Sequence, residues 1–332
     1  MTKLGVVGIF GSNLIPCDRI VERLPAVPKY TALESSNPLE QFLAGQLSES
    51  TRRAYYADLC HFFDSADISL EKIRAVSFHH VVAFRNGLAE QGYKRTSINR
   101  KLSSLKAFFK MMTAAGLIEK NPADSALVRG YRLEANLTGK AINKKALKQI
   151  VEAISEQKDE LVRARDTAIV YVLTYGGLRR SEAASISWED LIQEGAFHVL
   201  KLPVTKSGAP QDIKLQPIVI HHLEEYKNTL LLHRYPTGGK VFLGHSNRSR
   251  GKPLTAQSIN LIVKRYALRA GVPERITAHM FRHTCCTLAI EGGAKPQQVQ
   301  AHLRHKDLKT TMRYYENRER LTDNASDYIR IG

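Results

Sequence analysis

The sequence has few cysteines, and none of them has the spacing of a metal or redox site. The four cysteines are Cys17, Cys60, Cys285 and Cys286, and they form no CxxC pair and no zinc-finger pattern with histidine. We expect the adjacent pair Cys285–Cys286 to be two small buried helix residues rather than a redox couple. This cysteine usage excludes a disulfide-rich secreted domain and fits a reducing, intracellular compartment.

Long hydrophobic runs are also absent. No stretch reaches the roughly 18 apolar residues that a membrane-spanning helix needs. The segment Leu4–Phe10 is short and broken by glycine, and only Lys3 precedes it, which makes a poor signal peptide. Neither an isolated basic amphipathic helix nor a lipid-anchor motif is present, so we expect no membrane partner and a cytoplasmic location.

Acidic residues are scarce relative to basic ones. Lysine and arginine total 49 and aspartate and glutamate total 32, which gives a net charge of +17. A protein this basic is typical of those that bind a polyanion, and nucleic acid is the first candidate. The hydrophobic fraction of 43% suffices for ordinary cores, and 332 residues correspond to roughly two domains of about 150 residues.

Residues 38–122 have a helical periodicity and no strand pattern. Apolar residues recur at three- and four-residue steps in runs that begin near Leu39, Ser48, Val81 and Thr96. We therefore expect a small all-α domain of about four helices. Residues 1–37, which three prolines interrupt, form a leader to which no function is assigned, and residues 123–139 are the expected linker.

Residues 140–320 combine helical runs with one hairpin pattern. Two β-prone segments, Phe197–Leu202 and Ile213–Ile220, flank a turn at Lys206-Ser207-Gly208. Helical runs are expected at 143–154, 166–174, 220–231, 255–270, 279–291 and 296–303. The expected fold class is mainly α with a small antiparallel sheet, followed by a C-terminal tail at 321–332.

The last helix expected in the first domain is strongly basic. Six lysines and arginines fall between Lys94 and Lys110 with no acidic residue among them, opposite an apolar stripe. Exposed charged faces usually mix both signs, so this pattern favours DNA contact over a merely solvated face. The residues expected to contact DNA are Lys94, Arg95, Ser97, Asn99, Arg100, Lys101 and Lys106.

Two motifs in the second domain suit a phosphate. Arg179 follows the Gly176-Gly177 turn, where a guanidinium can present its fork to phosphate oxygens. His279 and Arg282 are three residues apart and therefore share one helix face, so that one can manage protons while the other neutralises charge. We interpret His283 as a packed or solvated histidine and leave it out of the site.

These motifs belong to a longer series with the order Arg…His-x-x-Arg…His…Tyr, namely Arg179, His279, Arg282, His305 and Tyr314. The series resembles the signature of the tyrosine recombinase family, of the phage-integrase, Xer and Cre type. Lys206 matches the catalytic lysine of the family by position, and Glu182 matches the acidic residue that follows its first arginine. The resemblance covers the chain from about Pro38 onward and implies a SAM-like helical core-binding domain (38–122) with a catalytic domain (140–320).

The resemblance implies a site-specific DNA recombinase that needs no cofactor and no metal. Tyr314 would attack a backbone phosphate and form a 3′-phosphotyrosine, while Arg179 and Arg282 neutralise the phosphate. His279 would accept a proton or hydrogen-bond the phosphate, His305 would hydrogen-bond it, and Lys206 would protonate the leaving oxygen.

The family further implies a tetramer on two DNA sites that exchanges strands through a Holliday junction. The apolar tail 321–332 would dock on a neighbouring protomer, or else pack on its own domain. A mobile element is the favoured context, and a Xer-like resolvase of chromosome or plasmid dimers is the alternative. A non-catalytic DNA-binding regulator and a type IB topoisomerase are the less favoured hypotheses. The sequence does not identify accessory proteins.

The chain departs from the family pattern at two places. Arg304 stands where the family's Leu-Gly-His motif has glycine, which leaves the geometry of that turn open. Tyr315 lies beside Tyr314, and the spacing from His305 favours Tyr314 as the nucleophile.

Overall fold

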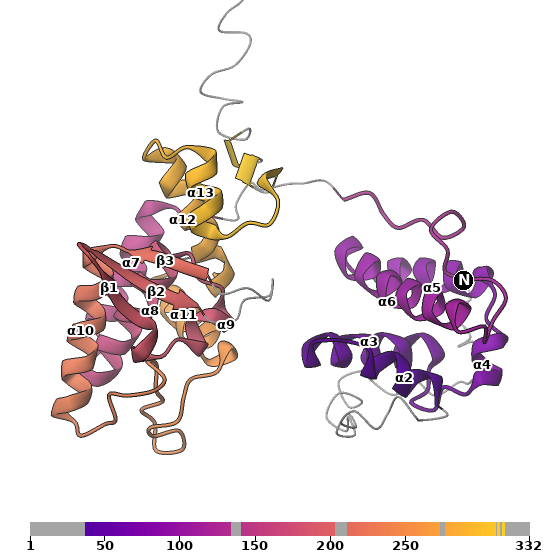
Figure 1. Ribbon diagram of the computed structural model, residues 1–332, viewed down its shortest axis with the longest axis horizontal. Coiled ribbons are helices and arrows are strands. Elements are labelled where there is room, and N and C mark those ends of the chain that lie inside the picture. The colour runs from indigo at the N-terminus through magenta and orange to yellow at the C-terminus, as the bar shows by residue number, and fades with distance from the viewer. Residues whose placement is uncertain are drawn as a thin grey trace, which may run out of the picture. The chain divides into compact units, whose positions relative to one another are not determined.

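The computed structural model describes residues 37–133, 141–202, 211–272, 276–309, 311–312 and 314–315. The chain divides into two units, Met1–Ala135 and Asn136–Gly332 (Figure 1). Each unit has its own hydrophobic core. The described residues are mostly helical, with one small antiparallel sheet, so the expected fold class is confirmed.

The described secondary structure of the first unit is all helical, and turns and irregular segments connect its helices. Its helices are α2 (Pro38–Ala44), α3 (Glu49–Phe63), α4 (Leu70–Arg74), α5 (Phe78–Glu90) and α6 (Arg95–Ala114). The Ser48 hydroxyl accepts a hydrogen bond from the Thr51 backbone N–H, as expected for the N-cap of α3. The sequence did not predict α4, because five residues are too few to show a helical period.

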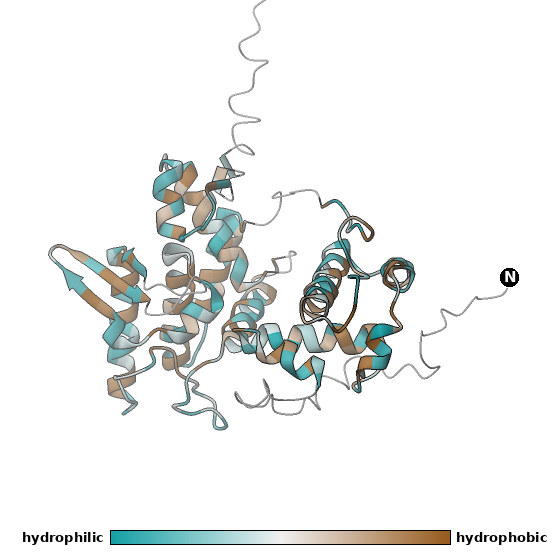
Figure 2. Cartoon of the chain, turned by 45° about the vertical axis from the view of Figure 1, so that its right-hand side comes forward, coloured by the Kyte–Doolittle hydropathy of each residue, from teal (hydrophilic) through white to brown (hydrophobic). Residues whose placement is uncertain are grey.

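Aromatic side chains fill the core of the first unit. Phe62 and Phe63 of α3 meet Phe108 and Phe109 of α6 edge-on or tilted, with ring centroids 6.2 to 6.4 Å apart. The helices carry hydrophobic and hydrophilic residues on different sides (Figure 2), and the hydrophobic side of α6 is the apolar stripe that the sequence predicts. This packing fixes which side of α6 is turned away from the core.

Part of the segment expected as a linker packs on the first unit. Ala123 and Val128 are fully buried in its core. The Asn99 side chain of α6 donates to the Tyr131 carbonyl at 2.7 Å and accepts from the Tyr131 backbone N–H at 2.8 Å. The described residues 123–133 are therefore tied to α6, and residues 134–139 lie outside the described part.

The second unit contains eight labelled helical segments and three strands among its described residues. In chain order they are α7 (Lys144–Ser155), α8 (Glu160–Gly176), α9 (Arg180–Ser185), the 3-10 turn η2 (Trp188–Asp190), β1 (Leu191–Glu194), β2 (Phe197–Leu202), β3 (Gln211–Leu215), α10 (Pro217–Leu232), α11 (Ala256–Arg269), α12 (Ala278–Glu291) and α13 (Pro296–Leu303).

The three strands form an antiparallel sheet in the order β1-β2-β3. Leu202 pairs with Gln211 and Leu200 pairs with Ile213, so β2 and β3 form the expected hairpin. The expected second strand ran to Ile220, which is wrong beyond Leu215, because Pro217 at the first position begins α10 instead. Strand β1 was not predicted, since four residues give too short an alternation.

Helix α8 lies at the centre of the second unit. It contacts α7, α10, α12 and β3, and residues such as Ala168, Ile169 and Leu173 are fully buried. A smaller apolar cluster joins α12 to α13 and includes Cys285, Cys286 and Leu303. Among the described residues, no helix is both long and apolar enough to cross a bilayer.

Candidate active site

One pocket of the second unit gathers most of the residues that the sequence singles out. Its volume is about 320 Å³, and it is lined by Arg179, His279, Arg282, His283, His305, Lys306, Asp307 and Tyr314. Five of these are the five members of the predicted series, which are separated by up to 135 positions in the sequence. Lys206, the remaining predicted catalytic residue, lies outside the described residues.

Arg179 reaches the pocket through a tight turn between α8 and α9. Gly177 ends α8 with φ +56°, a left-handed conformation that suits glycine. A Cβ at Gly177 would lie 2.4 Å from Leu303 Cδ2, so the absence of a side chain also allows α13 to approach closely. Arg179 then occupies the N-cap position of α9, and its side chain is one-third exposed.

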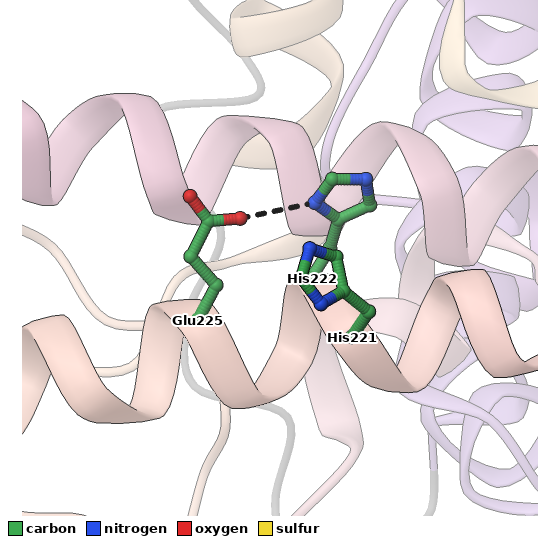
Figure 3. A group of neighbouring side chains, drawn as sticks. All are labelled: His221, His222 and Glu225. Carbon is green, nitrogen blue, oxygen red and sulfur yellow. Dashed lines mark hydrogen bonds and ion pairs between the residues drawn. The ribbon is translucent and has the colours of Figure 1, made fainter.

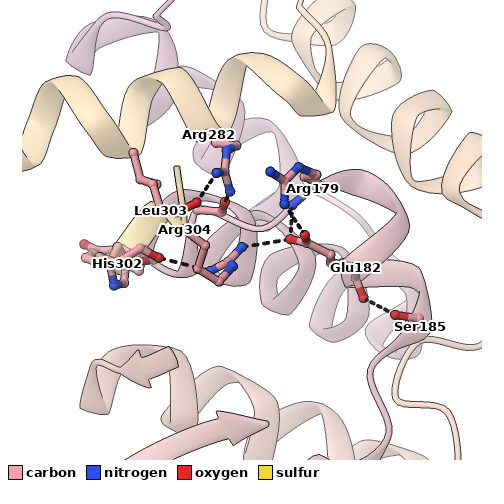
Figure 4. Close-up of polar contacts among 9 residues, drawn as sticks. Arg179, Glu182, Ser185, Arg282, His302, Leu303 and Arg304 are labelled. Atoms are coloured by element: carbon pink, nitrogen blue, oxygen red, sulfur yellow. Dashed lines mark hydrogen bonds and ion pairs between the residues drawn. The ribbon is translucent and has the colours of Figure 1, made fainter. Parts of the chain in front are cut away.

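Glu182 holds Arg179 in place (Figure 4). Its Oε1 atom lies 2.5 Å from Arg179 Nη1, and its Oε2 atom accepts from the Arg179 backbone N–H at 2.8 Å. Burial acts to raise the pKa of Glu182, but hydrogen bonds from Arg179 and the charge of Arg304 outweigh it and leave the pKa below its usual range. Glu182 is therefore a buried carboxylate whose two oxygens hold the side chain and the backbone N–H of Arg179.

Arg282 is the most deeply buried cation that lines the pocket, at 4% exposure. Its guanidinium donates to the carbonyl of Gly177 at 2.6 Å and to the carbonyl of Leu303. Burial and the charges of Arg179 and Arg304 lower its pKa to about 10, so Arg282 stays protonated at neutral pH. Two backbone carbonyls thus fix its plane and compensate part of its charge.

The histidines of α12 line the pocket one turn apart. The rings of His279 and His283 meet edge-on with centroids 4.7 Å apart. His283 Nδ1 is in hydrogen-bonding contact with the hydroxyl of Tyr314, and the two ring centroids are 5.7 Å apart. The sequence interpretation of His283 as a bystander missed this contact; its spacing of four residues from His279, which places both on one helix face, was the available signal.

His305 follows α13 and is poised as a neutral ring. Burial and the charges of Arg282, Arg179, Arg304 and His279 lower its pKa to about 4. Its Nδ1 atom lies 2.8 Å from the hydroxyl oxygen of Thr311, which is fully buried. That contact fixes the ring orientation, so that Nε2 is the nitrogen left for another partner.

The two adjacent tyrosines have different surroundings. Tyr314 lines the pocket, whereas the hydroxyl of Tyr315 donates to the Ala294 carbonyl. Both rings pack against the apolar cluster of α12 and α13. This arrangement favours Tyr314 over Tyr315 as the nucleophile.

The basic helix α6 of the first unit is less uniformly cationic than its sequence indicates. Asp58 of α3, which is 1% exposed, accepts from Arg100 Nη2 at 2.7 Å, from Lys101 Nζ at 3.2 Å and from the Ser104 hydroxyl at 2.6 Å. Lys101 is itself buried, with an exposure of 6%. The expectation that Lys101 contacts DNA is therefore corrected to an interior ion pair with Asp58.

The other residues expected to contact DNA are at or near the surface of α6 and its N-terminus. Lys94 and Arg95 are exposed, and the Arg95 guanidinium lies 5.8 Å from the Tyr131 ring centroid. Asn99 is occupied by the backbone of Tyr131, so its side chain serves the fold. Ser97 and Lys106 are half-buried.

A group of possible metal ligands lies on α10, separate from the pocket residues. His221, His222 and Glu225 offer ligand atoms within 4.8 Å of one another (Figure 3). His222 Nδ1 is 3.1 Å from Glu225 Oε2, which is an ordinary helical ion-pair spacing, and His221 and Glu225 are exposed. The group is typical of a hydrogen-bonded pair one helical turn apart, and we assign it no catalytic role.

Comparisons with known proteins match both units of the chain. Residues 140–320 match the sequence model of the phage integrase family, and residues 39–116 match that of the phage integrase N-terminal SAM-like domain. Tyrosine recombinase XerC of Thermodesulfovibrio yellowstonii is 30% identical over 276 residues, which cover 80% of this chain and 85% of the relative.

Solved structures share the fold. A lambda integrase dimer bound to a COC′ core site superposes with a TM-score of 0.66 at 17% identity, covering 89% of this chain and 96% of that chain. The Tn1549 transposon integrase in complex with circular intermediate DNA superposes with a TM-score of 0.63 at 19% identity, covering 89% of this chain and all of that chain.

Proposed function

The chain belongs to the phage integrase family, and from that premise we propose that it cuts and rejoins DNA through Tyr314. It is a site-specific tyrosine recombinase that acts on double-stranded DNA. The choice of residues rests on one observation: a single pocket is lined by Arg179, Arg282, His279, His305 and Tyr314.

The two arginines supply the electrostatic part of the reaction. The negative charge of a phosphodiester repels a nucleophile and spreads over the nonbridging oxygens in the transition state. Arg179 and Arg282 line the pocket as fixed cations, and such preorganised donors are worth several kcal/mol. A phosphate between them can be bound through two oxygens at once.

The nucleophile must lose a proton as it attacks, because a phenol has an ordinary pKa of about 10. The oxygen of Tyr314 forms a bond to phosphorus, and the bond from phosphorus to the 5′-oxygen breaks. His283 Nδ1, which contacts the hydroxyl, is placed to receive the proton, and His279 and His305 are placed to hydrogen-bond the phosphate oxygens.

The leaving 5′-oxygen takes a proton from a general acid. Lys206 is our candidate for that acid, because its place in the sequence matches that of the family's catalytic lysine. The products are a 3′-phosphotyrosine and a free 5′-hydroxyl. Because the ester linkage conserves the energy of the broken bond, the reverse step needs no external energy source such as ATP.

DNA binding and assembly follow from the same proposal. The exposed Lys94 and Arg95, together with Lys106, would contact the DNA backbone, since cations bind phosphates without regard to sequence. We propose a tetramer on two DNA sites with a Holliday junction intermediate. Docking of the tail 321–332 on a neighbouring protomer, and a cytoplasmic location with the DNA, belong to this proposal.

The biological role has two candidates. In the first, the protein integrates, excises or resolves the DNA of a mobile element. Similarity to XerC at 30% identity favours the second, a Xer-like resolution of chromosome or plasmid dimers. Deletion of the gene and sequencing of the host separates them: loss of excision junctions supports the first role, and accumulation of unresolved dimers supports the second.

Trapping of the covalent intermediate tests the proposed reaction. Purified protein is incubated with sheared DNA from its host, adducts are collected after denaturation, and the attached DNA ends are sequenced. The proposal expects adducts at a discrete site, attached through the DNA 3′ end, which Tyr314→Phe abolishes while DNA binding persists. A full adduct yield from Tyr314→Phe would remove Tyr314 as nucleophile.

Two outcomes would contradict the assignment as a recombinase. Absence of any adduct from the unaltered protein at DNA that it binds tightly would support a DNA-binding regulator. Relaxation of a supercoiled plasmid that lacks the mapped site would support a type IB topoisomerase instead.

A further inference from the structure

Arg304 adopts a backbone conformation that side chains seldom take. It follows α13 with φ +56° and ψ +45°, the left-handed region that glycine occupies without steric cost. Among the described residues, only Asp64 and Arg234 are other non-glycine residues with positive φ. A large side chain at this turn therefore needs a compensating interaction.

The side chain of Arg304 has such interactions. It is 3% exposed, and its Nη2 atom lies 2.8 Å from Glu182 Oε2 (Figure 4). Its Nη1 atom donates to the His302 carbonyl at 3.0 Å, while Nε is buried without a hydrogen-bond partner among the described residues. Burial is the main cause that lowers the pKa of Arg304.

Glu182 is thereby shared between two arginines. Its Oε1 atom pairs with Arg179 Nη1, and its Oε2 atom receives both the Arg179 backbone N–H and Arg304 Nη2. A carboxylate and a guanidinium otherwise tend to form a two-point pair, in which both oxygens bind both arms of one fork. With Oε2 occupied by Arg304, Glu182 binds the Arg179 side chain through a single nitrogen.

We propose that Arg304 is a positioning residue that prevents Glu182 from capturing the whole guanidinium of Arg179. The remaining donors of Arg179 then stay available for the phosphate. Arg304 is not among the described residues that line the pocket, so it acts through Glu182 rather than on the phosphate. This inference rests on the proposed function, in which Arg179 binds the scissile phosphate.

A double-mutant cycle tests this coupling. The substrate is the DNA duplex identified by mapping the covalent adducts. For each variant, the single-turnover rate of DNA cleavage and the dissociation constant for that duplex are measured. Arg304→Met keeps the stem and removes the charge, and we expect cleavage to slow about 10- to 100-fold with little change in affinity. Glu182→Gln in the Arg304→Met background removes the competing charge, and we expect it to recover about tenfold of the loss.

Two further variants separate positioning from folding. Arg304→Gly suits the left-handed backbone and also removes the guanidinium, so it should slow cleavage like Arg304→Met while the protein stays folded. Arg234→Gly is the matched control, because Arg234 has φ +57° but is exposed and does not line the pocket. We expect Arg234→Gly to cleave at the unaltered rate.

The inference is overturned if Arg304→Met and Arg304→Gly cleave at the unaltered rate. It is also overturned if the losses of Arg304→Met and of Glu182→Gln, each measured alone, simply add in the double variant, since additive losses would mean that the two residues stabilise the site independently. Failure of the unaltered protein to form any adduct would instead overturn the proposed function, which keeps the two failures distinct.

Discussion

The hydroxyl of Tyr314 is in hydrogen-bonding contact with Nδ1 of His283, and the two rings are tilted by 32° with centroids 5.7 Å apart. The contact joins the most C-terminal pocket residue to the middle of α12, where His279 and Arg282 also line the pocket. A neutral imidazole in this position can take the phenolic proton as the bond to phosphorus forms.

We therefore expect His283→Ala to slow adduct formation about 10- to 100-fold, because general-base assistance is typically worth that much or more. DNA affinity should change little, and the loss should shrink at high pH, where the phenol ionises without help. Single-turnover adduct yields across pH 6 to about 10, near the ordinary phenol pKa, measure this. Tyr315→Phe is the control, and it should form the covalent adduct at the unaltered rate. An unaltered rate of adduct formation in His283→Ala would show that His283 is not the general base.

Gly177→Ala should damage both stability and cleavage. The added Cβ would lie 2.4 Å from Leu303 Cδ2 and 3.2 Å from Cys285 Sγ, at a residue with φ +56°. We expect a loss of about 2 kcal/mol in the free energy of unfolding, from strain and overpacking together. Cleavage should fall too, because the Gly177 carbonyl holds Arg282. Urea unfolding measures the first effect, and a midpoint equal to that of the unaltered protein would contradict it.

Features with a local cause could be predicted from the sequence. Asn143 caps α7 and Thr255 caps α11 through contacts three residues away, and Pro296 begins α13 at the expected residue. The β2–β3 hairpin follows from two β-prone runs around a Ser-Gly turn. Each of these signals is complete within one short, continuous stretch of the sequence.

Features that depend on distant partners could not be predicted. Lys101 is a cation in a basic helix by sequence, and only the fold brings Asp58 of α3 to its ammonium. In the sequence, Arg304 is only a residue that departs from the Leu-Gly-His motif. Its partner Glu182 lies 122 residues away along the chain. The order of Arg179, His279, Arg282, His305 and Tyr314 indicates one site in the sequence, but only the fold brings the five side chains to one pocket.

His305 predicts a pH dependence of stability. Its pKa falls from 6.5 in the unfolded chain to about 4 in the folded one, so between these values the unfolded chain binds more protons. Stability therefore rises with pH through that window, and it is lost as pH falls from about 6.5 towards 4. His305→Asn should show a smaller loss there than the unaltered protein in urea titrations. Parallel pH curves for the two proteins would contradict this.

Two lysines at α6 should have opposite phenotypes. Lys94→Ala removes an exposed cation at the N-terminus of α6, so it should lower the slope of log affinity against log salt by about 1 on a duplex of random sequence. Lys101→Met removes a cation that is 6% exposed and 3.2 Å from Asp58. It should leave that slope unchanged, because the ammonium is buried. Loss of the ion pair should lower the free energy of unfolding by about 1 to 3 kcal/mol, and no more, because Asp58 keeps Arg100 and Ser104 as partners.

The pair is informative because the two substitutions remove the same charge. If binding depended on net charge alone, Lys94→Ala and Lys101→Met would weaken it equally. Fluorescence anisotropy at several salt concentrations and urea unfolding of the same samples separate the two effects. A reduced salt slope in Lys101→Met with an unchanged unfolding midpoint would mean that Lys101 leaves Asp58 to reach a phosphate, and would place it back on the DNA-binding face.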